Sequence, residues 1–523
     1  MKNLSKAGLL CAVAAGAMFA AAGAHANTLV IAEQQTPEGF DGDALRPRTQ
    51  HVVVQIYENL VRYARVEEDG RTVLNPDDVE PHLAESWTVS DDGMTWVFKL
   101  REGVLSPFGN ELTADDVVWG WEKSFDQRRT GNFIANVANV AGVRALSEYE
   151  VEFTLSAPSS IFLQALTLYI PGIYDTTEVK QHATDDDPWA LEWMESNTAG
   201  FGAYHLQTLR PGERAVFVAN PNYFLGQPYF TEVIFTEVPS EAARSTLLKA
   251  GQVQWIDRPS IQMTLDLQRD PNVKVDRFTG RSMAAVRMNP KCEPFDDVRV
   301  RQAFNYAIDK EALNEAVFAG TADIAKSVVP PAVGGHTEEH FLYDFNPERA
   351  RELIAEAGLE GSTETIEIMY ADIFWHQEPV AIQVAGQLRN HLGLDVQPRR
   401  ITGSEMRAAT APAEQTLCFF TFEDGPIVLD PVYTMFLLAH STGVSNRAGF
   451  RNAEIDAIID EARQELDLDT RLALMDEAQR IWIEQAPWIL TAYPATYEAM
   501  APNISGWVWH PDEHERWFDL RAD

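Results

Sequence analysis

Residues 79–125 read VEPHLAESWTVSDDGMTWVFKLREGVLSPFGNELTADDVVWGWEKSF, and this stretch decides the fold. Residues 87–89 and 95–100 alternate in polarity on either side of the turn-forming residues 90–93, which predicts a β-hairpin. Thr113 fits a helix N-cap, and apolar side chains then follow at helical spacing as far as Phe125. The stretch therefore predicts two strands, a polar loop and a helix.

The order of residue types in this stretch carries more information than its secondary structure. The patterns P-x-L-A-E-S-W-x-V-S-x-D-G-x-x-x-x-F-x-L-R-E-G-V and L-T-A-D-D-V-V closely resemble the signature of the family 5 extracellular solute-binding proteins. That family comprises the periplasmic peptide-binding receptors of ABC importers. An ordinary structural scaffold would explain the hairpin and the helix, but not this order of residues.

Further blocks extend the resemblance over almost the whole chain after residue 26. They are N-T-A-G-F-G-A-Y at 197–204, A-N-P-N-Y-F-L-G-Q-P at 219–228 and P-F-D-D-V-R-V-R-Q-A at 294–303. Apolar residues at helical spacing also predict helices at 52–63, 346–358, 379–392 and 452–486. No internal repeat, low-complexity tract or linker interrupts the pattern.

The resemblance implies an α/β fold of two lobes, a type II (cluster C-like) periplasmic binding protein with an extra subdomain inserted in the first lobe. The first lobe is expected at 27–59, 192–280 and 489–523, the inserted subdomain at 60–191 and the second lobe at 281–488. Such a receptor closes over its ligand by a hinge.

The first 26 residues have the pattern of a cleaved secretory signal peptide. Lys2 and Lys6 precede an apolar run, and Ala24-His25-Ala26 fits a small-x-small cleavage site. The apolar run is too short for a confident membrane span. We therefore expect a soluble protein exported to the periplasm.

The charge balance is strongly acidic, with 42 Lys and Arg against 78 Asp and Glu and a net charge of −36. This balance argues against nucleic acid or an anionic membrane surface as a partner. After the signal peptide only Cys292 and Cys418 remain. They either form a disulfide in an oxidising compartment or are two buried thiols, and the sequence leaves both open.

Motifs for catalysis are weak. Residues 336–340 (HTEEH) and 510–514 (HPDEH) both fit the zinc-protease pattern H-x-x-E-H. That chemistry needs both histidines on one face of a helix, whereas the first match follows two prolines and two glycines and the second contains a proline. No G-x-S-x-G, P-loop or C-x-x-C pattern occurs. We expect no enzyme activity, no metal and no cofactor.

The main candidate for ligand binding comes from the resemblance. The family's A-D-Y-x-D-P loop, whose aspartate holds the α-ammonium of a peptide, is similar to Glu423-Asp424-Gly425-Pro426 followed by Asp430-Pro431. Asp424 is thereby implied as the ammonium receptor, with Glu423 beside it. Residues 427–429 split the motif, and a solvated acidic turn is the alternative interpretation.

Other candidates also lie at family positions. His376 is placed where oligopeptide binders have a histidine near the peptide's C-terminus, with the aromatic Phe374 and Trp375 as pocket walls or core residues. Cleft-lining positions are occupied by Arg46, Arg287 and Phe133. Arg287 lies in the apolar stretch MAAVRM and needs a partner. That partner is either a ligand carboxylate or one of Glu423 and Asp424.

Together these features predict a monomeric periplasmic receptor that passes a short peptide or peptide-like solute to an ABC permease in the inner membrane. One rival keeps the fold and changes the ligand to a nickel chelate, haem, glutathione, an opine or an oligosaccharide. A second rival is a periplasmic hydrolase.

Overall fold

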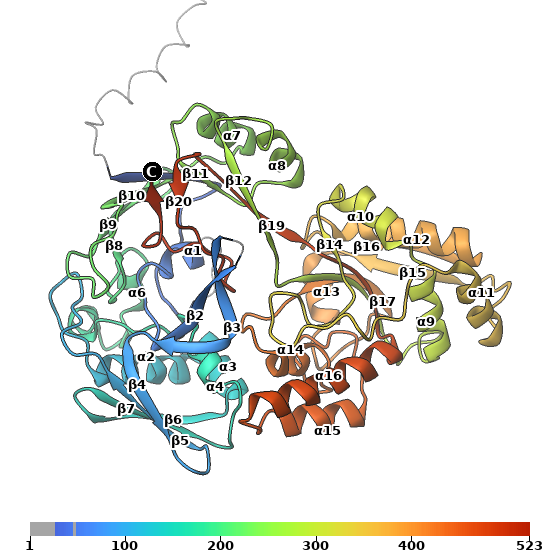
Figure 1. The fold of residues 1–523 in the computed structure, drawn as a ribbon, viewed down its shortest axis with the longest axis horizontal. Coiled ribbons are helices and arrows are strands. Elements are labelled where there is room, and N and C mark those ends of the chain that lie inside the picture. Colours follow the sequence, from blue (N-terminus) through green and yellow to red (C-terminus); the bar gives the residue numbers. More distant parts are fainter. Residues whose placement is uncertain (1–26, 45–48, 69) are drawn as a thin grey trace, which may run out of the picture.

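The structure is a computed structural model that describes residues 27–44, 49–68 and 70–523. The predicted signal peptide and Arg46 lie outside the described residues. Two lobes lie side by side, each built on its own β-sheet, and β12 and β19 run toward the second lobe where the lobes join (Figure 1). The predicted two-lobed α/β fold is confirmed.

Lobe I contains a seven-stranded sheet. Its strand order is β12 (Lys274–Thr279), β19 (Ala495–Met500), β11 (Trp255–Asp257), β1 (Thr28–Glu33), β10 (Glu232–Glu237), β9 (Arg214–Ala219) and β8 (Tyr204–Arg210). The first strand, β1, pairs in parallel with both β10 and β11. Both ends of the chain therefore contribute inner strands to one sheet. The helices of this lobe outside the insertion are α1 (Thr49–Val53), α7 (Glu241–Lys249) and α8 (Ile261–Leu267).

Lobe II contains a six-stranded sheet. Its order is β14 (Asp323–Ile324), β18 (Trp488–Tyr493), β13 (Met283–Met288), β17 (Phe419–Asp424), β15 (Thr365–Tyr370) and β16 (Asp395–Arg400). Every residue of β13 is buried, because its two faces contribute to two different apolar clusters. The surrounding helices are α9 (Val298–Tyr306), α10 (Lys310–Phe318), α11 (Pro347–Glu356), α12 (Gln377–Leu392), α13 (Gly403–Ala409), α14 (Pro431–Leu438), α15 (Ala453–Ala462) and α16 (Leu468–Gln485).

The stretch that decides the fold forms the centre of the insertion. The predicted hairpin is β4 (Ala84–Val89) and β5 (Thr95–Leu100), which pair antiparallel, and the predicted helix is α2 (Ala114–Gln127). Asp116 accepts hydrogen bonds from the backbone N–H and the hydroxyl of Thr113, which fixes the start of α2. The other elements are β2 (Val61–Glu68), β3 (Arg71–Pro81), α3 (Thr130–Val137), β6 (Val140–Ser147), β7 (Glu150–Leu155), α4 (Phe162–Ala165), α5 (Thr176–Val179), η1 (Lys180–His182) and α6 (Leu191–Met194).

The chain crosses between the lobes twice, from β12 to β13 and from β18 to β19. The return predicted at residue 489 falls inside β18, which still belongs to the sheet of lobe II, so the crossing lies at Pro494. The two crossings touch, because a Cβ atom placed on Gly280 would lie 2.6 Å from the carbonyl oxygen of Pro494. These segments form the hinge region. The remaining strands, β20 (Ile504–Ser505) and β21 (Arg521–Ala522), pair with each other near the C-terminus.

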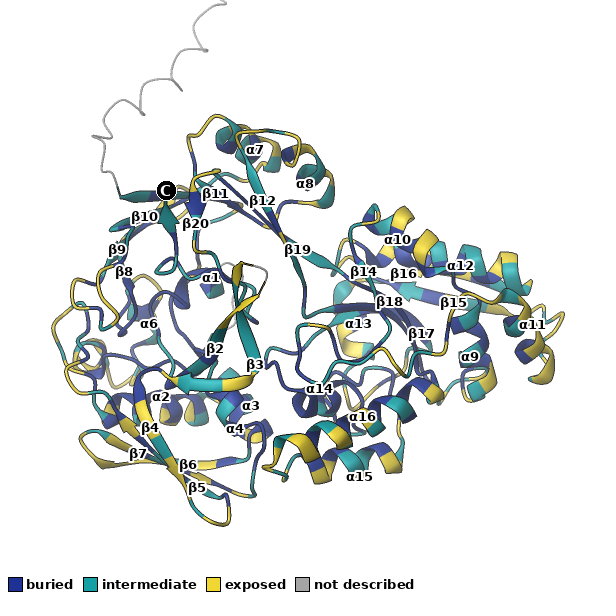
Figure 2. Cartoon of the chain, viewed as in Figure 1, coloured by how far each residue is buried: buried dark blue, intermediate teal, exposed yellow. Residues whose placement is uncertain are grey.

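The lobes are packed against each other. One apolar cluster continues from lobe I and its insertion into the side of lobe II that carries α14, α15 and α16, and buried segments run through both lobes (Figure 2). Polar contacts join the same surfaces: Ser160 donates its N–H to the carbonyl of Arg463 at 2.9 Å, and its own carbonyl accepts from Arg471 at 3.1 Å. The structure therefore shows the lobes in contact.

Cys292 and Cys418 form a disulfide, with their Cα atoms 5.6 Å apart. Of the two alternatives left by the sequence, the structure shows the bridge. It joins the loop that precedes α9 to the start of β17. None of the helices in the described residues has the length and apolar character needed to cross a membrane.

Candidate functional site

Asp424, the last residue of β17, is held by two arginines. Its Oδ2 lies 3.0 Å from Nη2 of Arg287 and 2.9 Å from Nε of Arg447, and its Oδ1 lies 3.0 Å from Nη2 of Arg447. Arg287 is fully buried on the neighbouring strand β13. The structure thus shows one of the partners expected for Arg287, which is Asp424.

Aromatic rings hold both guanidinium groups in place. The guanidinium carbon of Arg287 lies 3.2 Å from the ring centroid of Trp488, and that of Arg447 lies 4.2 Å from the ring centroid of Phe422. Burial lowers the pKa of Arg287, and the charge of Asp424 opposes this effect. The arginines are therefore positioned by rigid neighbours before any ligand arrives.

Glu423 and His376 form the second polar pair of this region. His376 Nε2 lies 2.5 Å from Glu423 Oε2, and the imidazole is almost fully buried. His376 precedes α12, whose first residue, Gln377, donates to the carbonyl of Thr421 in β17 at 2.8 Å. This bond sets the histidine beside the end of β17.

The two aromatic candidates next to His376 have different surroundings. The ring of Phe374 stacks on His376 with centroids 5.9 Å apart and packs with the apolar cluster of Phe422. Trp375 meets the edge of Phe318 but leaves 59% of its surface exposed. Phe374 is thus partly a core residue, whereas Trp375 presents a large apolar surface to solvent.

The segment after Asp424 reaches the boundary between the lobes. Arg281 donates from Nη1 to the carbonyls of Gly425 at 3.2 Å and Pro426 at 3.1 Å. Its Nε lies 3.7 Å from Glu513 of lobe I. A few residues on, Leu429 donates its N–H to the hydroxyl of Tyr63 in lobe I at 2.9 Å. The polar groups at the end of β17 therefore lie beside the surface where lobe II meets lobe I.

Phe133, the remaining predicted residue in the described chain, belongs to the inserted subdomain. It lies on α3 and packs, partly buried, against the main apolar cluster. Six of the eight candidates thus come from lobe II, one comes from the insertion, and Arg46 is outside the described residues.

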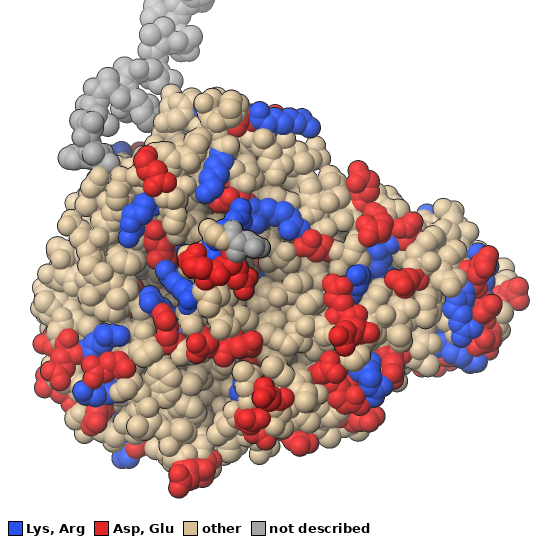
Figure 3. All heavy atoms as spheres, in the orientation of Figure 1, with Lys and Arg blue, Asp and Glu red and all other residues tan. Residues whose placement is uncertain are grey.

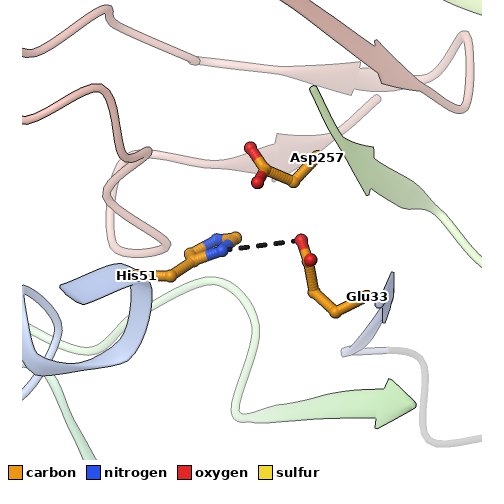
Figure 4. Close-up of side chains that lie close together, drawn as sticks. All are labelled: Glu33, His51 and Asp257. Atoms are coloured by element: carbon orange, nitrogen blue, oxygen red, sulfur yellow. Dashed lines mark ion pairs between the residues drawn. The ribbon is translucent and has the colours of Figure 1, made fainter. Parts of the chain in front are cut away.

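Lobe I contains a buried charged cluster of Glu33, His51 and Asp257 (Figure 4). One ring nitrogen of the histidine and one carboxylate oxygen of each acid lie within 4.8 Å of one another. His51 Nδ1 lies 3.6 Å from Glu33, while Nε2 lies 2.5 Å from Glu515. Burial favours the neutral imidazole, but Glu515, Asp257 and Glu33 outweigh it and raise the pKa of His51 to about 9. The described residues of this cluster form a buried ion-pair network centred on His51.

The two H-x-x-E-H matches are not helical. Residues 336–340 lie in an irregular segment that ends in a turn, where His336 Nδ1 bonds to the carbonyl of Val329 at 2.6 Å and His340 pairs with Asp476 at 2.8 Å. In the second match, Arg258 donates to Nδ1 of His514 at 3.1 Å. Neither pair has the one-turn helical spacing that zinc proteases use.

Two hollows lie elsewhere in the described residues, and none of the candidate ligand-binding residues lines either of them. A cavity of about 80 Å³ in lobe I is lined by charged side chains that are largely paired with one another, among them Glu58, Arg62, Arg65, His82, Asp512 and Arg516. An open hollow of about 640 Å³ lies beside the hinge strands, with Thr279, Asp323, Lys326, Glu338 and Tyr493 in its walls. Acidic side chains outnumber basic ones on much of the visible face (Figure 3).

Comparison with known proteins identifies the family. Residues 78–446 match the family described as bacterial extracellular solute-binding proteins, family 5 (middle region). The chain belongs to this family. As a family 5 protein, it is a solute-binding component of an ABC importer.

Relatives of this family 5 protein differ in their named ligands. It is 27% identical to heme-binding protein A of Haemophilus influenzae over 95% of this chain and 92% of that protein. It is 26% identical to the dipeptide-binding protein of Escherichia coli, over 97% of both chains. The structure of HbpA2 from Haemophilus parasuis matches with a TM-score of 0.84 and 24% identity, over 95% of this chain and 100% of that chain.

The structure places three further charged residues near the candidate residues, and the sequence analysis did not identify them. Arg447 lies in the irregular segment after α14, Arg281 lies just before β13, and Glu513 lies near the C-terminus. No motif or spacing connects them to Asp424. Arg447 and Arg281 reach the end of β17 only through the folding of lobe II, and Glu513 reaches Arg281 across the lobe boundary. A lone arginine between Asn446 and Ala448 is the only local signal for Arg447.

Proposed function

We propose that this family 5 protein is a periplasmic receptor that captures a short peptide or peptide-like solute between its lobes and delivers it to a membrane permease. The observation that carries the proposal is the position of the polar groups at the end of β17. Asp424 and Glu423 end β17, and Arg447 binds Asp424 from the segment after α14. The chain then continues from Asp424 into the contacts of Gly425 and Leu429 with Arg281 and Tyr63 at the lobe boundary.

The proposed binding region takes its lobe II wall from Asp424, Glu423, Arg287, His376, Phe374 and Trp375, and its opposite wall from Phe133. Arg46, the remaining candidate, lies outside the described residues. Charged groups on the first wall suit the ends and polar side chains of a peptide. The exposed ring of Trp375 offers apolar surface to a side chain. An extended peptide would lie between the lobes and be enclosed as they close.

The supporting comparison is with relatives that are named for di- and tripeptides, such as the di/tripeptide-binding protein 2 of Pseudomonas aeruginosa, 26% identical over 96% of both chains. The relative named for haem favours a second ligand class on the same fold. Secretion through a cleaved signal peptide, a monomeric state and lack of catalysis belong to the same proposal.

The test begins with native mass spectrometry of the purified protein and whatever it has retained. A thermal-shift screen follows with di- and tripeptide mixtures, haem, glutathione, nickel–histidine and oligosaccharides, because a ligand of the folded state raises stability by RT ln(1 + [L]/Kd). Peptides should raise the melting temperature. A shift with haem or a metal chelate alone would contradict the peptide class and support the second candidate.

Hinge closure of the two lobes is tested by a separate measurement. Small-angle scattering with and without the best ligand should show a monomer whose radius of gyration falls on binding. An unchanged radius would contradict the hinge mechanism. Incubation of the retained ligand with the protein, followed by chromatography, addresses the hydrolase rival, since a receptor returns its ligand intact.

A further inference from the structure

The carboxylate of Asp424 has little capacity left for a ligand. A carboxylate accepts about four hydrogen bonds. Oδ1 already lies 3.2 Å from Nε and 3.0 Å from Nη2 of Arg447, and Oδ2 lies 2.9 Å from the same Nε and 3.0 Å from Nη2 of Arg287. An ammonium group would have to displace one of these arginines.

The charge of this cluster also disfavours an ammonium. Two guanidinium groups face one carboxylate, so the group of Arg287, Arg447 and Asp424 carries an excess positive charge. Glu423, the other nearby acid, is engaged by His376. A third arginine, Arg281, binds the carbonyls of Gly425 and Pro426 immediately after Asp424 and is faced by Glu513 of lobe I. The positive excess therefore belongs to the group of Arg287, Arg447 and Asp424, in a chain whose net charge is −36.

Donor groups remain available for an acidic partner. Nε and Nη1 of Arg287 are buried and have no hydrogen-bond acceptor among the described residues. Arg447 uses Nε and Nη2 for Asp424, while 22% of its side chain stays exposed. Leaving buried guanidinium donors unpaired is costly, and a carboxylate is the acceptor that matches their geometry.

The arginines are also pre-organised. Trp488 lies under one face of the Arg287 guanidinium, and Phe422 lies under one face of the Arg447 guanidinium. Asp424 accepts hydrogen bonds from both arginines. Arg447 is the reachable member, and Arg287 lies behind it as a second positive charge. Such a fixed pair loses little freedom when it binds an anion.

We propose that the end of β17 receives an acidic group of the ligand through Arg447, backed by Arg287, and that Asp424 holds these arginines instead of receiving a ligand amine. The inference rests on the proposed function, since it assigns the chemistry of one end of the peptide-like ligand. It reverses the charge preference that the family resemblance implies for Asp424.

The experiment compares three forms of trialanine amide, which has no C-terminal carboxylate. They differ only at the N-terminus: the free amine, the N-acetyl form and the N-succinyl form, whose short added chain ends in a carboxylate. Calorimetry should give the tightest binding for the succinyl form, by about tenfold over the acetyl form, and the weakest for the free amine. Preference for the free amine would overturn the inference and restore Asp424 as an ammonium receptor.

Variants test whether Arg447 produces the preference for the succinyl form. Arg447→Gln should lose the succinyl preference, and Arg447→Lys should recover part of it, because lysine keeps the charge without the paired donors. The matched control is Arg451→Gln, which removes the same charge from an exposed position four residues further on. Equal loss in both glutamine variants would mean a general charge effect and would contradict the inference.

A second arm separates this inference from the peptide proposal. Sodium succinate is compared with sodium chloride at equal ionic strength, using the melting temperature of the wild type and of Arg447→Gln. If no trialanine form binds but succinate stabilises the wild type and not the variant, the acidic subsite stands and the peptide class fails. If succinate stabilises neither protein and the peptides bind without preference for the succinyl form, the acidic subsite fails and the peptide proposal stands. If no trialanine form binds and succinate stabilises neither protein, the acidic subsite fails as well.

Discussion

Arg281 of lobe II and Glu513 of lobe I face each other across the boundary between the lobes, with Nε of the arginine 3.7 Å from Oε1 of the glutamate. Glu513 is held from its own side by Arg258, at 3.3 Å, and Arg281 is held by two backbone carbonyls of the segment after β17. The pair thus connects the C-terminal segment of lobe I with the candidate ligand site. It joins the two lobes beside the hinge region.

Replacing Glu513 by glutamine should weaken closure. A partly exposed ion pair contributes about 0.2–1 kcal/mol, so ligand Kd should rise between about 1.4-fold and 5-fold. Scattering should also show a larger radius of gyration for the unliganded variant. The control is Glu213→Gln, which breaks a surface pair with Arg210 inside lobe I. A variant that matches the wild type in both measurements would show that the pair plays no part in closure.

The buried His51 should make stability depend on pH. Its pKa of about 9 in the folded protein exceeds the unfolded value near 6.5. The stabilisation is therefore complete below about pH 6.5 and is lost as the pH rises towards 9. Denaturant unfolding of wild type and His51→Gln should show a larger difference at pH 6 than at pH 9.

A surface histidine provides the comparison for this pH effect. His182 lies on η1 and is partly exposed beside Glu178. The pH-dependent change in stability caused by His51→Gln should exceed the change caused by His182→Gln. A constant difference between wild type and His51→Gln across this pH range would contradict a protonated His51.

Loss of the Cys292–Cys418 bridge should destabilise lobe II. The bridge closes a loop of 126 residues, and removal of a native disulfide typically lowers the free energy of unfolding by about 2–5 kcal/mol. Unfolding of the wild type with and without reductant measures this loss. The double variant Cys292→Ser/Cys418→Ser should be equally destabilised and insensitive to reductant. A wild type that is unaffected by complete reduction would contradict the prediction.

Gly280→Ala should disturb the hinge region. The new Cβ would lie 2.6 Å from the carbonyl oxygen of Pro494, and a backbone atom cannot rotate away. We expect the free energy of unfolding to fall by about 1–3 kcal/mol, together with a change in radius of gyration. Gly142→Ala is the control, because nothing lies within 4 Å of its added Cβ. Equal behaviour of the two variants would show that the crossings do not constrain each other.

Local patterns predicted the elements whose hydrogen bonds are local. The hairpin of β4 and β5 and the helix α2 form as expected because turn residues and a cap specify them. The helix predicted at 52–63 is wrong beyond Val53, where α1 ends. The carbonyls of Gln55 and Ile56, which would continue a helix, accept instead from Tyr204 and Gly202. These hydrogen bonds depend on residues about 150 positions further along the chain. The spacing of apolar residues within a helix cannot predict such distant contacts.

A second helix prediction failed for a different reason. The helix expected at 452–486 is divided into α15 and α16. The carbonyl of Arg463 accepts from Ser160 of the insertion, and Asp467 caps the new helix by accepting from Thr470.

In the candidate site, the family resemblance led to Asp424 and Glu423, but Arg447 and Arg281 come near them only through folding. The roles assigned to the eight candidate residues stay predictions.

The strand order of lobe I has a consequence for the order in which the chain can fold. β19, at residues 495–500, lies between β12 and β11, so the sheet that begins with β1 cannot be completed until almost the entire polypeptide has been delivered. Pairing over such sequence distances is slow, so this sheet is expected to form late in folding. A chain stopped before residue 495 would leave the edge of β11 uncovered, an open template for aggregation.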